Sequence, residues 1–255
     1  MSSQLILSLV SGIFISGVAG YLGTLMLSRK MSVVAGPLAH LALPGAALAI
    51  IFGSSLFLGV FPFVLLGTVL IWVLERKTRL PMENLAAIIF AFGLGTALLI
   101  LPIDKAEAAL IGTIGTISLT ETVIVVAIAS LAFGLTKVMY AKLILAGIHE
   151  DLAQSSEVNV SLYNFGYLFS IGLVVSLGVY LVGGLITAAL IAIPSATAKN
   201  VSHDLKSYKI WAVSSGIAAT IAGIVVSRFY PLPTGPLIIV VGACLFVLTV
   251  LIKRK

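Results

Sequence analysis

The chain has 255 residues, of which 60% are hydrophobic and only 9% are charged. A soluble globular domain carries about 25% charged residues, so this composition indicates an integral membrane protein with no separate soluble domain. The net charge of +6 does not indicate nucleic-acid binding, because the basic residues lie between and at the ends of apolar stretches. We therefore expect a single transmembrane domain over residues 1–255, and the lone Cys244 excludes an internal disulfide.

Nine apolar stretches follow one another along the chain, and most are long enough to span a membrane, with the seventh short. The first is longer than the core of a signal peptide and has no basic region before it, so we interpret it as a retained span. The sequence thus predicts an all-α fold, a polytopic membrane helical bundle of about nine transmembrane segments. The stretches are 5–27, 33–52, 56–74, 84–101, 121–140, 162–181, 184–198, 211–227 and 236–252.

The basic residues select one orientation of this bundle. If the N-terminus is outside, 13 of the 15 Lys and Arg residues fall on the inner side, and only Lys105 and Arg228 fall outside. The positive-inside rule therefore predicts an external N-terminus and a cytoplasmic C-terminus in the cell membrane. It also favours nine spans over eight, because the loss of one span would invert every later loop.

Two segments between the spans are long enough to have structure of their own. Residues 101–122 are external in this orientation, and their Gly and Thr content predicts a short helix and a turn at the outer surface. Residues 147–164 are internal, and their acidic start predicts a short helix lying on the cytoplasmic face. An ordinary solvated loop is the alternative for the second segment.

The chain lacks the motifs of the common hydrolases. It contains no phosphate-binding G-x-x-x-x-G-K-[ST] loop, no H-E-x-x-H, no cysteine pair and no nucleophile elbow, so we expect a protein that is not an enzyme and has no ATPase motif of its own. All nine acidic residues lie at or between the ends of the predicted spans. A carrier driven by protons or sodium usually needs an ionisable group within its spans, and His40 is the only deep candidate.

His40 lies in the stretch VAGPLAHLALPGAALAI, and its surroundings suit a polar passage. Counting about 1.5 Å per residue from Val33 puts His40 roughly 10 Å into the membrane. Pro44 has no N–H, so it leaves the carbonyl of His40 without its usual helical partner. Small residues recur on one side of this helix and would let another helix approach closely; they are Ala35, Ala39, Ala42, Ala46 and Ala49. The alternative is a histidine that hydrogen-bonds a neighbouring helix beside a proline kink.

Five stretches, in this order, resemble the membrane permease family of zinc, manganese and iron ABC importers. LAHLALPGAALA is similar to that family's Ser-His-(x)-x-Leu-Pro-Gly helix, and ALIGTIGTISLTET is similar to its outer segment. IHEDLAQSSEVNV resembles its cytoplasmic coupling segment, and GGLITAALIAIPSATAK resembles its helix ending in Pro-Ala-Ala-Thr-Ala. GIVVSRFYPLPTGPLIIV resembles its final turn and span, so the resemblance covers about residues 20–252.

The resemblance implies a permease of the ABC importer type that forms a homodimer around a central pathway. It implies a cytoplasmic ATPase subunit on each protomer, an extracellular metal-binding protein, and a divalent metal as transported substrate rather than a permanently bound cofactor. Gly36, His40 and Pro44 would line the transport pathway, with His40 as the metal ligand. The residues expected to couple the permease to the ATPase are Glu150, Asp151, Leu152, Ala153 and Ser156.

Two departures from the family pattern bear on the substrate. The family usually has an aspartate four residues before the histidine, where this chain has Gly36, and it often has a glycine where this chain has Glu157. Residues four apart share a helix face, so the usual pair would offer a carboxylate and an imidazole together. A permease relative for another solute, or a scaffold subunit that transports nothing, is therefore the alternative function.

Overall fold

The computed structural model describes residues 2–28, 35–100, 117–148, 160–184, 187–230 and 232–252. Within these ranges all regular structure is helical, and each of the nine predicted apolar stretches forms a helix. The helices are α1 (Ser2–Ser28), α2 (Ala35–Phe52), α3 (Leu56–Thr78), α4 (Met82–Ile100), α6 (Leu119–Ile148), α8 (Val160–Leu181), α9 (Thr187–Val201), α10 (Leu205–Phe229) and α11 (Thr234–Ile252). The all-α bundle is thus confirmed.

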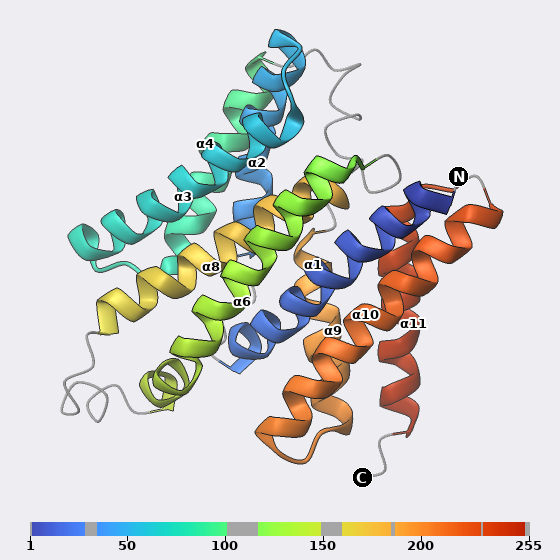
Figure 1. Cartoon of the computed structure of the whole chain (residues 1–255). Helices are drawn as coiled ribbons and strands as arrows, with labels where there is room; N and C mark the ends of the chain where they lie inside the picture. Colours follow the sequence, from blue (N-terminus) through green and yellow to red (C-terminus); the bar gives the residue numbers. More distant parts are fainter. Residues whose placement is uncertain are drawn as a thin grey trace.

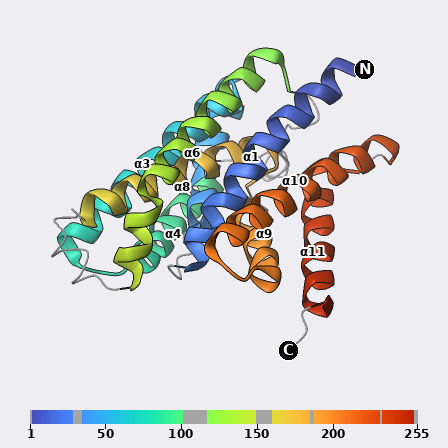
Figure 2. The ribbon, with the colours of Figure 1, turned by 60° about the horizontal axis from the view of Figure 1, so that its bottom comes forward.

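The helices form two groups joined through α1, α6 and α8 (Figures 1 and 2). Helix α2 packs against α3 and α4 in one group, and α9, α10 and α11 pack against one another in the other. Helix α6 contacts both α1 and α8, while α1 contacts α9 and α10 and α8 contacts α3. The N- and C-terminal ends lie at opposite ends of the bundle, as an odd number of crossings requires.

Length and composition make this a multi-pass membrane protein. Among the described residues, seven helices are long and apolar enough to cross a membrane. Helix α9 has 15 residues, or about 22 Å of helix, which is less than the roughly 30 Å hydrocarbon core. Its buried face packs against α10 and α11, so this short seventh segment, which the sequence predicts to be short, lies within the protein.

Two helices extend well beyond their predicted bounds. Helix α6 continues to Ile148 rather than ending at residue 140, and it includes both Lys137 and Lys142. Both lysines are exposed, and long basic side chains can extend along a helix toward water without ending it. Helix α10 begins at Leu205 rather than at residue 211, because the exposed Asp204 caps it: Asp204 Oδ1 accepts the N–H of Ser207 at 2.6 Å.

The segments between the predicted spans are shorter than expected where the structure describes them. Residues 119–122 belong to α6 rather than to an outer surface helix, and residues 160–164 begin α8 rather than ending a cytoplasmic segment. The remaining parts, residues 101–116 and 149–159, lie outside the described residues.

The closest approach of α2 and α3 occurs between two glycines. A methyl group on Gly45 would lie 2.8 Å from the carbonyl carbon of Gly59, and a methyl group on Gly59 would lie 3.0 Å from that of Gly45. Ala49 on α2 adjoins the same point. All five alanines of the predicted stripe are buried, but the close helix approach itself is made by Gly45, with Ala49 as the one stripe residue beside it.

Candidate functional site

The predicted pathway residues lie on α2, which continues through Pro44 as one helix from Ala35 to Phe52. Pro44 cannot donate a hydrogen bond, so the carbonyl of His40 has no helical donor four residues further on. Helix α2 is enclosed by α3, α4, α8 and α9, so neighbouring helices rather than lipid surround most of it. This position in the bundle suits a helix with an interrupted hydrogen-bond ladder.

The imidazole of His40 is partly buried and contacts α4. Its ring lies edge-on to the ring of Phe90, with the ring centroids 5.0 Å apart. The buried Nδ1 atom has no hydrogen-bond partner among the described residues. A buried polar atom without a partner carries an energetic cost, and such atoms often mark functional sites. The alternative interpretation expects His40 to hydrogen-bond a neighbouring helix, and the Nδ1 atom makes no such bond to the described residues.

Gly36 lies one helical turn before His40 and faces α9. A methyl group built on Gly36 would meet only the Cβ atom of Ala188, at 3.9 Å, which is ordinary van der Waals contact. The position therefore has room for a side chain, and the missing carboxylate is not excluded by packing.

Pro44 lies beside an apolar cavity of about 320 Å³ between α2, α3 and α4. Leu41, Phe63 and Phe92 are among its lining residues, and Thr96 is the single hydroxyl-bearing residue there. His40 does not line this cavity, so the described residues do not place the imidazole and Pro44 in one polar chamber.

A complete metal site does not form within the described part of one chain. No group of three or more His, Cys, Asp or Glu side chains there is close enough to hold a metal ion. His203, the other described histidine, lies in the turn between α9 and α10 and not on α2. Among the described residues, the predicted pathway on α2 thus offers a single imidazole, which alone is a weak ligand set for a divalent transition metal.

The predicted coupling residues, from Glu150 to Ser156, lie outside the described residues. The helices on either side of them are described and are joined near their ends. Lys142 on α6 donates a hydrogen bond from Nζ to the hydroxyl of Tyr163 on α8 at 2.6 Å, and its ammonium lies 4.9 Å from the centre of that ring. This contact joins α6 to α8.

The structure adds a polar cluster at the opposite end of α6 and α8 that the sequence analysis did not identify. Ser118 and Glu121 form a capping box, in which the Ser118 N–H donates to Glu121 Oε2 at 2.8 Å and the Glu121 N–H donates to Ser118 Oγ at 3.3 Å. Tyr180 on α8 donates its hydroxyl proton to the other carboxylate oxygen, Glu121 Oε1. The Ser-x-x-Glu spacing of SLTE is the sequence pattern that predicts such a box, whereas the Tyr180 contact depends on tertiary packing.

Comparison with known proteins agrees with this architecture. The ABC 3 transport family matches residues 1–253. The chain is 24% identical over 252 residues to the manganese import system permease protein ScaB of Streptococcus gordonii, covering 97% of this chain and 91% of that protein. It is 28% identical over 260 residues to the high-affinity zinc uptake system membrane protein ZnuB of Haemophilus influenzae, covering 97% of each.

Two solved structures share the fold. The PsaBC structure from Streptococcus pneumoniae in complex with Fab contains a chain with a TM-score of 0.83 and 23% identity, covering all of this chain and 97% of that one. A metal-chelate type ABC transporter described as putative, in an inward-facing conformation, gives a TM-score of 0.78 and 17% identity, covering 96% and 85%. The fold is thus that of an ABC importer permease, and the match over nearly the whole sequence shows that the chain belongs to the ABC 3 transport family.

Proposed function

We propose that residues 1–255 form one permease domain that carries a divalent transition metal, such as zinc, manganese or iron, into the cytoplasm as part of an ABC importer. The observation that carries this proposal is the family match over residues 1–253, with relatives named for manganese import and zinc uptake. The metal is the substrate, and no resident cofactor is part of the proposal.

His40 is the proposed metal ligand of the pathway. Imidazole suits first-row transition ions, and the unpartnered Nδ1 atom of His40 leaves a buried nitrogen available to a passing ion. A neutral ligand without a carboxylate beside it binds weakly, which suits a conduit from which the ion must leave. Because α2 carries a single histidine, a homodimer that brings two His40 side chains toward a shared axis would strengthen the site.

The partners follow from the likeness to ABC importer permeases. A separate cytoplasmic ATPase supplies the energy, which agrees with the lack of a phosphate-binding loop in the sequence, and an extracellular metal-binding protein supplies the ion. Residues 150–156 are the proposed contact with the ATPase, and the Lys142–Tyr163 hydrogen bond supports this by holding their flanking helices together.

Uptake of radioactive zinc and manganese tests the proposal in cells that express the importer genes with and without this chain. His40→Ala should abolish most uptake while the ATPase still co-purifies with the permease. His203→Ala is the matched control, because it removes an imidazole from an exposed turn, and it should leave uptake unchanged. Normal uptake by a stable, ATPase-bound His40→Ala complex would remove His40 from the pathway.

The coupling segment needs a separate test. Replacement of Ala153 by tryptophan should release the ATPase or uncouple it, while the permease still inserts and purifies as a folded protein. Retained ATPase binding and transport, both in this variant and after deletion of residues 150–157, would show that the segment is only a loop.

A second candidate function is compatible with the same fold but does not involve metal transport. Gly36 removes the carboxylate expected beside His40, and the described residues hold no three-ligand cluster. These observations favour a permease for another solute or a scaffold subunit without transport. Uptake of none of the three metals by an assembled complex with an active ATPase would support this second function.

A further inference from the structure

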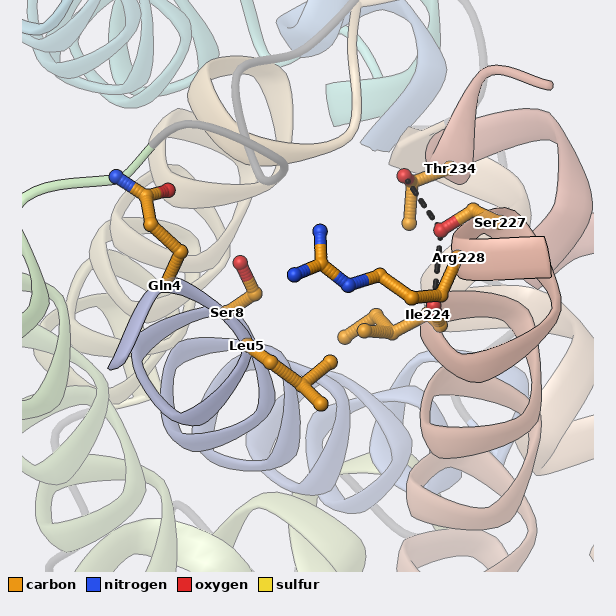
Figure 3. A pocket seen from close by; sticks show the side chains of 7 residues that line it. All are labelled: Gln4, Leu5, Ser8, Ile224, Ser227, Arg228 and Thr234. Atoms are coloured by element: carbon orange, nitrogen blue, oxygen red, sulfur yellow. Dashed lines mark hydrogen bonds between the residues drawn. The ribbon is translucent and has the colours of Figure 1, made fainter. Parts of the chain in front are cut away.

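A polar cavity of about 190 Å³ lies between one end of α1 and the adjoining ends of α10 and α11, away from α2. Figure 3 shows the guanidinium group of Arg228 extending into it toward Gln4 and Ser8 of α1. The cavity is far larger than the roughly 15 Å³ that a single water needs. The lining residues are Gln4, Leu5, Ser8, Ile224, Ser227, Arg228 and Thr234.

Hydrogen bonds fix the wall that carries Arg228. Thr234 at the start of α11 donates from Oγ1 to Ser227 Oγ at 3.1 Å, and Ser227 donates from Oγ to the carbonyl of Ile224 at 2.8 Å. The first bond joins α10 to α11 directly beside Arg228, and the second holds the Ser227 hydroxyl within α10. The backbone that carries Arg228 is therefore held in place at a helix junction. This lowers the conformational entropy that is lost when the guanidinium group binds a ligand.

The charge of the cavity favours an anion. Arg228 is its one ionisable lining residue among those described, and none of these lining residues is acidic. A guanidinium has five N–H donors, so it can engage a protein group and a ligand at the same time. Its planar fork matches the paired oxygens of phosphate or carboxylate.

The surroundings of the cavity favour a membrane lipid as the source of that anion. Phe229 and Tyr230, which follow Arg228 directly, are 78% and 62% exposed, and Ile6 and Leu232 are also exposed apolar residues. Exposed aromatic rings at the ends of membrane spans are typical of the headgroup level of a bilayer. A cation and hydroxyl groups in a cavity at that level face phospholipid phosphates.

We propose that this cavity binds the phosphate group of a phospholipid, with Arg228 as the principal ligand and Gln4 and Ser8 as further polar contacts. In the predicted orientation the lipid belongs to the outer leaflet. Arg228, one of two basic residues on the side that the positive-inside rule depletes of positive charge, then has a specific partner there. The bound lipid would join α1 to the α10–α11 pair.

The test uses the full-length chain in detergent, with phosphatidylglycerol as the probe and binding measured by native mass spectrometry and thermal shift. Arg228→Gln should weaken phosphatidylglycerol binding by about tenfold or more, because it removes a charge-assisted, forked contact. Arg228→Lys keeps the charge without the fork and should give intermediate binding. Lys206→Gln removes the same charge at the other end of α10 and should leave this lipid site unchanged.

Three further arms identify the ligand. Diacylglycerol with the same acyl chains should not bind in an Arg228-dependent way, because it lacks phosphate; equal binding of the two lipids would overturn the proposal. Inorganic phosphate that binds as tightly as the lipid would assign the site to a free anion instead. Undiminished lipid binding by a folded Arg228→Gln chain would also overturn the proposal. If the Arg228→Gln chain bound lipid normally but no longer captured an added external metal-binding protein, the cavity would instead bind a carboxylate of that protein.

Discussion

In the proposed pathway, metal binding rests on one side chain, His40, because the position one turn before it is Gly36. A carboxylate there would supply both charge and a second ligand, and its absence makes the site neutral. The structure shows that Gly36 is not forced by packing, since a methyl group at this position would lie 3.9 Å from its nearest neighbour, the Cβ atom of Ala188. The weak binding proposed for His40 therefore follows from the chemistry of position 36 and not from a lack of space there.

Restoration of the carboxylate should strengthen metal binding. Gly36→Asp should raise the affinity of the purified permease for zinc by about tenfold or more, since a charged ligand joins the imidazole, and should slow uptake by delaying release. Gly36→Asn is the matched control, because it has nearly the same shape without the charge. Equal zinc affinities of the Asp and Asn variants, measured by calorimetry, would show that a negative charge at position 36 does not contribute to zinc binding.

The cap of α10 should make its first turn sensitive to acid. The hydrogen bond from the N–H of Ser207 holds the pKa of Asp204 below its usual value. The contribution of the cap is therefore complete above the pKa of Asp204 in the unfolded chain, and it is lost as pH falls through the lower folded-state pKa. Hydrogen exchange at residues 205–209, corrected for intrinsic rates, should rise at acidic pH in the natural chain but not in Asp204→Asn, which caps without titrating. The same acid-induced rise in both proteins would exclude the cap as its cause.

At the scale of helices, the α2–α3 contact depends on glycine at two facing positions. Gly45 and Gly59 bring the backbones together so closely that neither can carry a methyl group without movement. This contact lies on the C-terminal side of Pro44, near the apolar cavity that α2, α3 and α4 share.

Methyl groups on glycines at different helix positions should have opposite effects. Gly45→Ala should destabilise the protein by about 1–3 kcal/mol, because α2 and α3 must separate, and should lower its melting temperature in detergent. Gly95→Ala on α4 is the control: a methyl group there meets nothing within 4 Å, so the higher helix propensity of alanine should leave stability equal or raised. A melting temperature for Gly45→Ala as high as that of Gly95→Ala would disprove the tight contact.

The sequence predicts the helices well and their partners poorly, and the reason is physical. Apolar length is a local property, so all nine helices were predicted, but their ends depend on details such as the Asp204 cap and the exposed Lys142. The imidazole of His40 could be singled out because it stands in an apolar stretch. Its contact with Phe90 could not be predicted, because that contact depends on which helices pack together.

At the scale of the whole molecule, the two ends of the bundle differ in charge. Arg76 and Lys199 lie in the last turns of α3 and α9, whereas Arg228 lies in the last turn of α10, a helix that runs in the opposite direction to α9. A membrane protein inserted by the positive-inside rule places the end with Arg76 and Lys199 in the cytoplasm.

Reporter fusions measure this orientation directly. A phosphatase that is active only outside the cytoplasm should be inactive after Lys255 and active when inserted near Lys105. A fluorescent protein that folds only in the cytoplasm should give the opposite pattern. Phosphatase activity at the C-terminal fusion would contradict a nine-crossing bundle with an external N-terminus.

The glycine contact between α2 and α3 also limits how the importer can alternate its access. At this point the two backbones touch with no side chain between them, so no change of side-chain rotamer could accommodate a sliding movement. We therefore expect α2 and α3 to move together as one rigid unit. The opposite edge of α2 is different, because Gly36 meets α9 only through the loose approach to Ala188. We expect the passage proposed around His40 to open and close along this edge, with α2 and α3 moving together against α9.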